Sequence, residues 1–226
     1  MKNAILSSLF VVMTLFLNGP AEAETNEAEK KFIRAGLVDV QSIDPTIQVD
    51  LVNSDPDKNY FRKNFYNGLT RAYLQKEVAI KLSQAQKILR RKYHGYSLLI
   101  LDAARPRNVS RLMYEQMKGT SFEKFVANPS KGSMHNYGIA VDITIVDKSG
   151  EELDMGFNPF RKSTLELTWL YAKKKAGIQL TDHQKKNRAL LADTMKQAGF
   201  IPLSFEWWHF NGMPKSEARS RFKIIE

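Results

Sequence analysis

The residues best suited to catalysis in this sequence are two histidines that lie near carboxylates. His135 precedes Asp142 by seven positions, and His209 follows Glu206 by three. The chain has no cysteine, so any metal site must be built from histidine, aspartate or glutamate. Two histidines and one aspartate suit a catalytic zinc ion, because such sites use three protein ligands and leave a fourth position for water. His135, Asp142 and His209 are therefore candidate ligands of one zinc ion.

The other two histidines lie in poorer surroundings. His94 follows a basic segment that is expected to be helical, and His183 lies in the first turn of another expected helix. Both side chains are expected to face solvent and to have no catalytic role.

The spacing between His135 and Asp142 requires the chain to turn back. Seven extended residues would span about 23 Å, whereas a zinc ligand lies only about 2 Å from the metal. The segment Asn136-Tyr137-Gly138 has the residue types of a turn and permits this reversal. Asp142 would then lie in an apolar strand, where an unpaired carboxylate is costly and a bound metal would explain its presence. The alternative is an ordinary aspartate at a strand edge or turn.

Glu206 and His209 raise a problem of side-chain direction. Strict alternation along a strand would place residues three apart on opposite faces, so a bulge, a twist or a strand end must bring both to one side. Chemically the pair is sensible, because His209 would bind zinc while Glu206 takes a proton from the activated water. The alternative is an aromatic core strand whose polar side chains are exposed.

Arg105 is the fourth candidate. A fixed guanidinium beside zinc could stabilise the oxyanion of a tetrahedral intermediate, and Asp102, three residues earlier, could orient it through a salt bridge. The alternative is a surface ion pair in a loop.

The elements that must position these residues follow from hydrophobic spacing, capping residues and turn residues. Asn108 is expected to cap one helix, Thr181 and Gln184 form a capping box for another, and Gly199 ends that second helix. Strands and helices occur without a regular βαβ rhythm, which predicts a single α+β domain with a small antiparallel or mixed sheet, flanking helices and a zinc site in a cleft. The expected helices cover residues 70–93, 108–118, 163–175 and 181–197; the expected strands cover 46–51, 97–101, 139–146 and 203–210; residues 53–59 are expected to form a loop.

Composition limits the class of protein. The chain has 226 residues, 43% of them hydrophobic, which suits one domain with a filled core and excludes disorder for most of it. Without cysteine it cannot be a disulfide scaffold or use a thiolate nucleophile. The net charge of +10 indicates either contact with anionic cell-envelope polymers or simply a solvated basic surface. Nucleic-acid binding is not expected, because the basic residues lack interleaved stacking aromatics.

Residues 1–23 have the pattern of a secretory signal peptide. Lys2 precedes an apolar run from Ala4 to Leu17, and Ala21-Glu22-Ala23 matches a cleavage site. The run of about 14 residues is short for a spanning helix, which needs about 20. We therefore expect an exported protein, periplasmic or secreted, whose catalytic domain covers residues 24–226. The alternative is an uncleaved membrane anchor.

Three separated motifs together resemble the D-alanyl-D-alanine dipeptidase family of zinc peptidases, which includes the vancomycin-resistance dipeptidase. The pattern Ser-x-His-x-x-Gly-x-Ala-x-Asp is met between Ser133 and Asp142, and Glu-x-Trp-His is met at residues 206–209. Residues 102–106 are similar to the family's Asp-Gly-Tyr-Arg-Pro stretch, with alanines at the second and third positions. The likeness runs from about residue 40 to residue 211.

The resemblance implies roles for these residues. His135, Asp142 and His209 would bind one Zn²⁺ per chain, Glu206 would be the general base, and Arg105 would steady the transition state. The substrate would be D-Ala-D-Ala from cell-wall peptide metabolism. Two other functions remain open: a D,D- or L,D-carboxypeptidase acting on longer peptidoglycan stems, and a non-catalytic cell-wall-binding module.

Ser133 has two possible roles under the same resemblance. Its hydroxyl would either contact the substrate or stabilise the turn that carries the neighbouring histidine.

One departure from the family concerns substrate length. The dipeptidases carry an acidic residue after a Met-Gly pair, and it binds the free amino group of the substrate. Here Met155-Gly156 is followed by Phe-Asn-Pro-Phe, with no carboxylate at the matching place, although Asp154 precedes the pair. Catalysis is therefore predicted more firmly than the choice between a dipeptide and a longer peptide.

Overall fold

The central strand of the molecule is β5 (Ala140–Val146), which is buried along its whole length. The computed structural model describes residues 26–59, 61–119, 123, 127–156, 179–204 and 206–226. Antiparallel to β5 lie β4 (Ser97–Asp102) on one side and β7 (Glu206–Asn211) on the other. The sheet is completed by β2 (Gln48–Val49), parallel to β4, and β6 (Ile201–Leu203), antiparallel to β7. β4 and β5 are nearly continuous apolar runs because both of their faces are covered.

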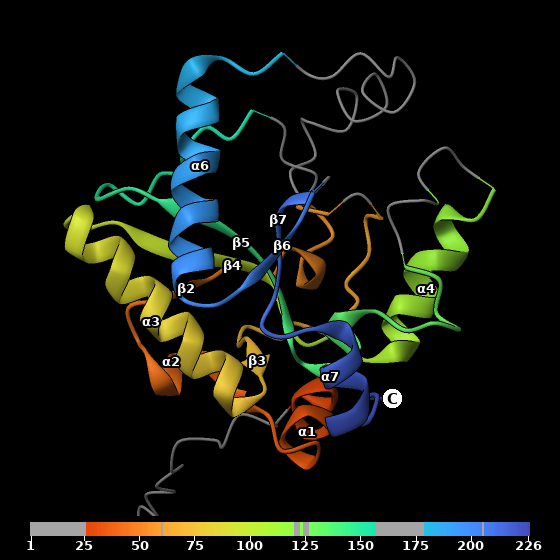
Figure 1. Ribbon diagram of the computed structural model, residues 1–226. Coiled ribbons are helices and arrows are strands. Elements are labelled where there is room, and N and C mark those ends of the chain that lie inside the picture. Colours follow the sequence, from red (N-terminus) through yellow and green to blue (C-terminus); the bar gives the residue numbers. More distant parts are fainter. Residues whose placement is uncertain (1–25, 60, 120–122, 124–126, 157–178, 205) are drawn as a thin grey trace, which may run out of the picture.

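Two long helices pack on the sheet. α3 (Lys76–Lys92) contacts β4, and α6 (Asp182–Gln197) contacts β6, β7 and α3 (Figure 1). The buried face of α3 includes Val78, Leu82 and Leu89, which recur at helical spacing and pack in the main core. The single α+β domain with a small mixed sheet is thus confirmed.

Shorter elements surround this frame. Near the N-terminal side, β1 (Val38–Asp39) pairs with β3 (Tyr73–Leu74) in a separate two-stranded sheet. Within the described residues, the remaining helices are α1 (Glu27–Arg34), α2 (Val40–Ile43), α4 (Arg107–Met117) and α7 (Lys215–Arg221), with 3-10 turns η1 (Val52–Ser54) and η3 (Met134–Tyr137).

Several boundaries differ from the sequence prediction. The expected strand over residues 46–51 is shorter in the structure: β2 covers Gln48–Val49, the N–H of Asp50 makes one further bond to the carbonyl of Ile100, and η1 begins at Val52. The helix expected from residue 70 begins at Lys76, since Tyr73–Leu74 are taken up by β3. Asn108 is not the cap of α4. Pro106, with an extended backbone, occupies that position, and the helix begins at the next residue.

The C-terminal strand is also different from the prediction. Instead of one strand over residues 203–210, β6 and β7 form an antiparallel pair in which Leu203 lies opposite Glu206. By contrast, the capping box of Thr181 and Gln184 opens α6 as predicted, and Gly199 follows its end with a φ of +84°.

Two predicted segments lie outside the described residues: the signal peptide at 1–23 and the helix at 163–175. Within the part of the chain that is described, no helix combines the length and apolarity needed to cross a bilayer.

Candidate active site

His135 and Asp142 are brought together by the reversal that their spacing required. His135 lies in η3, and Gly138 ends this turn in the left-handed conformation with a φ of +66°. A Cβ at residue 138 would lie 2.6 Å from Cδ2 of Leu37, so the turn also needs the small size of glycine. The chain then enters β5, and Oδ2 of Asp142 lies 3.3 Å from Nε2 of His135.

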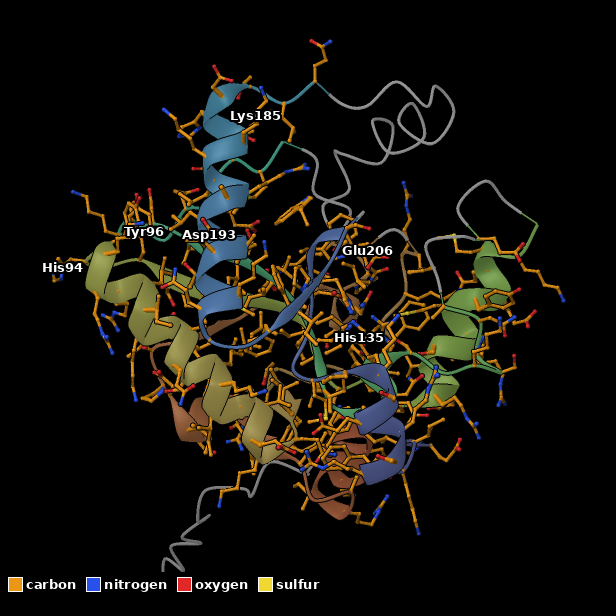
Figure 2. The ribbon with its side chains drawn as sticks, in the orientation of Figure 1. His94, Tyr96, His135, Lys185, Asp193 and Glu206 are labelled. Carbon is orange, nitrogen blue, oxygen red and sulfur yellow. The ribbon has the colours of Figure 1, made fainter. Side chains whose placement is uncertain are left out.

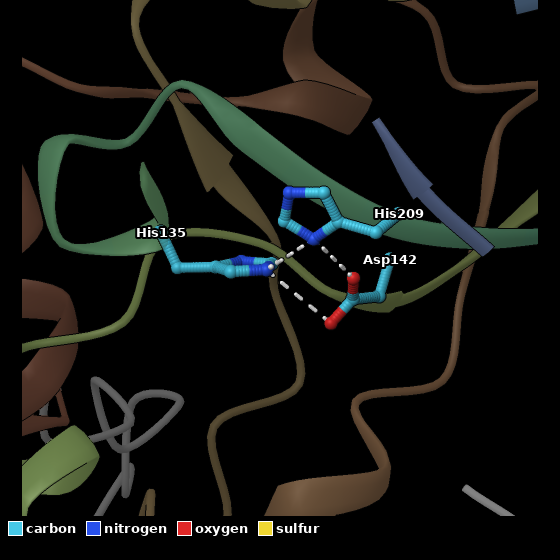
Figure 3. Close-up of side chains that lie close together, drawn as sticks. All are labelled: His135, Asp142 and His209. Carbon is cyan, nitrogen blue, oxygen red and sulfur yellow. Dashed lines mark hydrogen bonds and ion pairs between the residues drawn. The ribbon is translucent and has the colours of Figure 1, made fainter. Parts of the chain in front are cut away.

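His209 reaches the same point from β7. It lies directly opposite Asp142 in the β5–β7 ladder, which places the two side chains on one face. Nδ1 of His209 is 2.9 Å from Oδ1 of Asp142 and 3.2 Å from Nε2 of His135 (Figure 3). All three side chains are buried, and their ligand atoms lie within 4.8 Å of one another, a grouping that could hold a metal ion.

The outward nitrogens of both histidines show that this cluster suits a cation. Nδ1 of His135 lies 2.7 Å from the carbonyl oxygen of Ala103, and Nε2 of His209 lies 3.1 Å from Oδ1 of Asn211. Because these oxygens only accept hydrogen bonds, each outward nitrogen carries a proton, which leaves each inward nitrogen as the one that can give a lone pair to a metal ion.

When both rings are neutral, their two lone pairs and the carboxylate of Asp142 would converge on one point, with the guanidinium of Arg105 beside them. Ligands about 2.0–2.1 Å from a tetrahedral zinc ion lie about 3.3 Å from each other. Nε2 of His135 and Nδ1 of His209 are 3.2 Å apart, close to this value, and they contact different oxygens of Asp142, at 3.3 and 2.9 Å. The donor set thus suits a metal ion such as zinc in chemistry, and the separation of its two nitrogens is close to the expected one.

Electrostatics keep Asp142 ionised at the centre of the cluster. Burial by itself would raise the pKa of Asp142, but attraction to His135 and hydrogen bonds from both histidines hold it well below its usual range. Burial would lower the pKa of His209, yet the hydrogen bond and charge of Asp142 raise it overall. Without metal, the pair of His209 and Asp142 favours holding a proton, which a metal ion would displace on binding.

Asn211 was not identified from the sequence. It follows His209 by two positions on the same strand, so its side chain is on the same face and fixes the ring through Nε2. The position of Asn211 two residues after His209 is the sequence feature that could have identified it.

Glu206 lies at the start of β7, where the β6–β7 register is irregular. Pro202 pairs with Phe210, whereas the next residue, Leu203, pairs with Glu206. This is the irregularity that the three-residue spacing required, and it leaves Oε2 of Glu206 3.9 Å from Nδ1 of His209. The side chain of Glu206 is 17% exposed, and burial together with the charge of Asp142 raises its pKa, against the opposing pull of His209. A raised pKa suits a group that takes and returns a proton.

Arg105 is held inside the molecule, so the alternative of a surface ion pair is wrong. Its Nε lies 3.0 Å from Oδ2 of Asp102, and its Nη2 contacts the same oxygen. The same Nη2 lies 3.9 Å from Oδ2 of Asp142, so it stands between the two carboxylates. Burial would lower the pKa of Arg105, but the charge of Asp102 raises it, so the guanidinium stays charged beside the site.

Ser133 stabilises the turn. Its hydroxyl accepts a hydrogen bond from the backbone N–H of His135 at 3.3 Å, and its own N–H donates to Oδ1 of Asn136 at 2.7 Å. The two bonds form a capping box at the start of η3. A contact between Ser133 and substrate stays a prediction.

The other residues considered from the sequence are not part of the cluster of His135, Asp142 and His209. His94 and His183 are exposed, as expected, and Figure 2 shows His94 at the end of α3, well apart from His135 and Glu206. The carboxylate of Asp154 accepts bonds from the N–H of Gly156 at 2.7 Å and from Nε2 of Gln184 at 3.0 Å. It is therefore engaged in fixing its own loop, and residues 157–160 lie outside the described part of the chain.

Comparison with known proteins identifies the family. The peptidase M15 family, described as D-ala-D-ala dipeptidase, matches residues 33–225. This chain belongs to that family.

Among curated proteins, it is 30% identical to the D-alanyl-D-alanine dipeptidase of Escherichia coli (strain K12) over 176 residues, which cover 77% of this chain and 83% of that protein. The Synechocystis sp. (strain ATCC 27184 / PCC 6803 / Kazusa) protein of the same name is 27% identical over 65% of this chain and 71% of its own length.

Among solved structures, the LdcB LD-carboxypeptidase is 20% identical, with a TM-score of 0.40 over 66% of this chain and 63% of that chain. This likeness is too distant to bear on function. Family membership by sequence is enough to confirm the resemblance seen in the motifs. It identifies the protein as an enzyme, a metallopeptidase, rather than a non-catalytic wall-binding module.

Proposed function

We propose that this protein is a zinc-dependent D-alanyl-D-alanine dipeptidase of cell-wall peptide metabolism. The observation that carries the proposal is the convergence of three metal-ligating atoms, from His135, Asp142 and His209, beside the half-buried carboxylate of Glu206. One zinc ion per chain would be held by Nε2 of His135, Nδ1 of His209 and a carboxylate oxygen of Asp142. Relatives named D-alanyl-D-alanine dipeptidase support the choice of substrate.

The chemistry is divided between the zinc ion and the surrounding side chains. When bound, zinc supplies a Lewis acid that polarises the scissile carbonyl and lowers the pKa of the attacking water. Glu206 takes the proton of that water on its carboxylate and returns it to the leaving amine. Asn211 and the carbonyl of Ala103 keep the two imidazole rings oriented throughout.

Arg105 stabilises the charge that develops during attack. Its guanidinium is already ordered by Asp102 and lies on the Asp142 side of the cluster. A fixed cation in this place favours the oxyanion more than the neutral carbonyl, which is what lowers the barrier.

The first test compares two substrates. Amine release is measured from free D-Ala-D-Ala and from an N-acylated D-Ala-D-Ala peptide, each with zinc and with a chelator. Cleavage of the free dipeptide alone, abolished by the chelator, supports the dipeptidase. No cleavage of either substrate in the zinc-loaded protein would overturn it.

A carboxypeptidase acting on longer stem peptides is the second candidate. It is favoured by the absence of a carboxylate in residues 157–160 and by the engagement of Asp154 with Gly156 and Gln184. Without a counter-charge for the substrate's amino group, a blocked amine would be accepted. Cleavage of the acylated peptide at a rate equal to or above that of the dipeptide would establish this function.

We also propose that residues 1–23 direct export and are then removed, which places the enzyme in the periplasm or outside the cell. The basic composition, +10 overall, suits a location among anionic envelope polymers. The intact mass of protein recovered from the producing cells tests this: a mass that still includes residues 1–23 contradicts cleavage.

A further inference from the structure

Asp102, the partner of Arg105, is the most heavily hydrogen-bonded carboxylate near the site. It lies at the end of β4 and is fully buried, at 0% exposure. Besides Arg105 it accepts a bond from the N–H of Ala103 at 2.9 Å. Two further donors come from a distant part of the chain: the hydroxyl of Tyr66 at 2.9 Å from Oδ1, and Nδ2 of Asn53 at 2.9 Å from Oδ2.

These two donors belong to a segment that no sequence motif marked as functional. Asn53 lies in η1 and Tyr66 in the loop before β3, 49 and 36 residues from Asp102 in sequence. Both are buried, Tyr66 at 1% and Asn53 at 5% exposure. Burial, followed by the charge of Asp102, raises the pKa of Tyr66 well above its usual value, so its hydroxyl remains a donor.

The direction of the Arg105 guanidinium depends on this carboxylate. Both Nε and Nη2 of Arg105 bond to Oδ2 of Asp102, so the position of the guanidinium depends on the position of this one oxygen. Each oxygen has more than one donor, Tyr66 and the N–H of Ala103 on Oδ1, and Asn53 and Arg105 on Oδ2, so a carboxylate that loses the Tyr66 or Asn53 donor is less firmly fixed and can rotate about its own side chain. The guanidinium bonded to Oδ2 would move with it, which changes its placement beside Asp142.

We propose that Tyr66 and Asn53 are positioning residues for catalysis: by fixing the two oxygens of Asp102, they hold Arg105 in the orientation that stabilises the transition state. This inference rests on the proposed function, in which Arg105 acts on the oxyanion. It assigns to residues 53 and 66 an effect on the rate of reaction rather than on metal binding, because their contacts with the site run through Asp102 and Arg105.

The decisive variant is Tyr66→Phe, which removes one hydroxyl and leaves the buried ring. We expect kcat for the zinc-loaded full-length enzyme to fall about tenfold, the scale of a lost hydrogen bond to a charged group, while KM and zinc stoichiometry stay the same. Tyr73→Phe is the matched control, since Tyr73 is also buried but its hydroxyl bonds to Glu29, and kcat should not change.

A double-mutant cycle separates positioning from general destabilisation. In an Arg105→Ala background, Tyr66→Phe should cause no further loss of kcat, because the group that it positions has gone. The same fold-loss in both backgrounds would overturn the proposal, as would an unchanged kcat in Tyr66→Phe. Asn53→Ala is expected to behave like Tyr66→Phe, with its effect also lost in the Arg105→Ala background.

A readout independent of activity distinguishes failure of this inference from failure of the proposed function. Exchange of the Arg105 Nε–H with water, followed by NMR, should be slow in the parent and at least about tenfold faster in Tyr66→Phe, but not in Tyr73→Phe. Unchanged exchange refutes the positioning role even if D-Ala-D-Ala is hydrolysed. Faster exchange in Tyr66→Phe, in a protein whose parent cleaves neither test peptide, would support the role of Tyr66 in orienting Arg105. The same result would show that the proposed substrate is wrong.

Discussion

The two ends of β7 are built in opposite ways. At the His209 end, three consecutive residues pair in regular register with β5: His209 with Asp142, Phe210 with Val141 and Asn211 with Ala140. These residues are buried, and the ring of His209 is held at both nitrogens. At the Glu206 end the pairing with β6 shifts register, and the carboxylate is partly exposed.

This difference matches the two tasks in catalysis. Metal ligands must stay in place, and a regular ladder with outer hydrogen-bond partners fixes them. A general base must approach the water, take a proton and release it, so it benefits from a position where the ladder is interrupted and solvent is near. The regular end of β7 therefore serves metal binding and the irregular end serves proton transfer. The variants that follow test this division.

The largest effect is expected from His209→Ala at the regular end. Removing one of three ligands should abolish stable zinc binding and, with it, measurable peptide hydrolysis. Zinc content by elemental analysis, with activity measured on the same sample, checks this. His183→Ala, which alters an exposed histidine, should keep full zinc and activity. A full zinc stoichiometry in His209→Ala would refute the ligand role.

At the irregular end, Glu206→Gln should separate binding from catalysis. The amide keeps the shape of the side chain but cannot accept the proton, so kcat should fall about 10²- to 10⁴-fold while zinc stays bound. Rate and zinc stoichiometry are measured together. Near-normal turnover would exclude Glu206 as the base, and loss of zinc would mean that the two ends of β7 do not divide their tasks as proposed.

Asn211→Ala tests the support behind a ligand. Removing the acceptor of the His209 Nε2–H should weaken zinc affinity about 10- to 100-fold, with kcat at saturating zinc changed much less. Competition with a zinc-binding dye gives the affinity. Asn211→Asp, which keeps an oxygen acceptor, should retain more of it, and equal losses in both variants would argue against this hydrogen bond.

Much of the arrangement around His135, Asp142 and Glu206 could be predicted from the sequence. The pattern Ser-x-His-x-x-Gly-x-Ala-x-Asp predicted both the reversal at Gly138 and the meeting of His135 with Asp142. Local chemistry sufficed there, because a left-handed glycine and a capping serine act within a few residues. The requirement for an irregularity near Glu206 could also be stated from strand geometry alone.

What sequence could not supply was contact between distant segments. The register shift opposite Leu203 depends on β6, a strand merged with β7 in the prediction. Tyr66 and Asn53 reach Asp102 only because the loop before β3 folds over the end of β4. Such contacts are set by tertiary packing, which leaves no short-range pattern to detect.

The smallest effect, and the sharpest test of the comparison, is expected from Gly138→Ala. Its left-handed backbone would cost an alanine about 1–2 kcal/mol, and the added Cβ would also press on Leu37 at 2.6 Å. Gly150→Ala is the control, because its φ is +87° but no atom lies within 4 Å. Denaturant unfolding should show a larger loss of stability at residue 138 than at residue 150.

Measuring zinc affinity in the same two variants then shows which end of β7 depends on the turn at Gly138. Gly138 places His135, which belongs with the regular end, so Gly138→Ala should weaken zinc binding while kcat at saturating zinc stays close to that of the parent. Gly150→Ala should alter neither. A fall in kcat without a fall in zinc affinity would mean that the turn at Gly138 also positions the proton-transfer machinery, and that the two ends of β7 are mechanically coupled through β5.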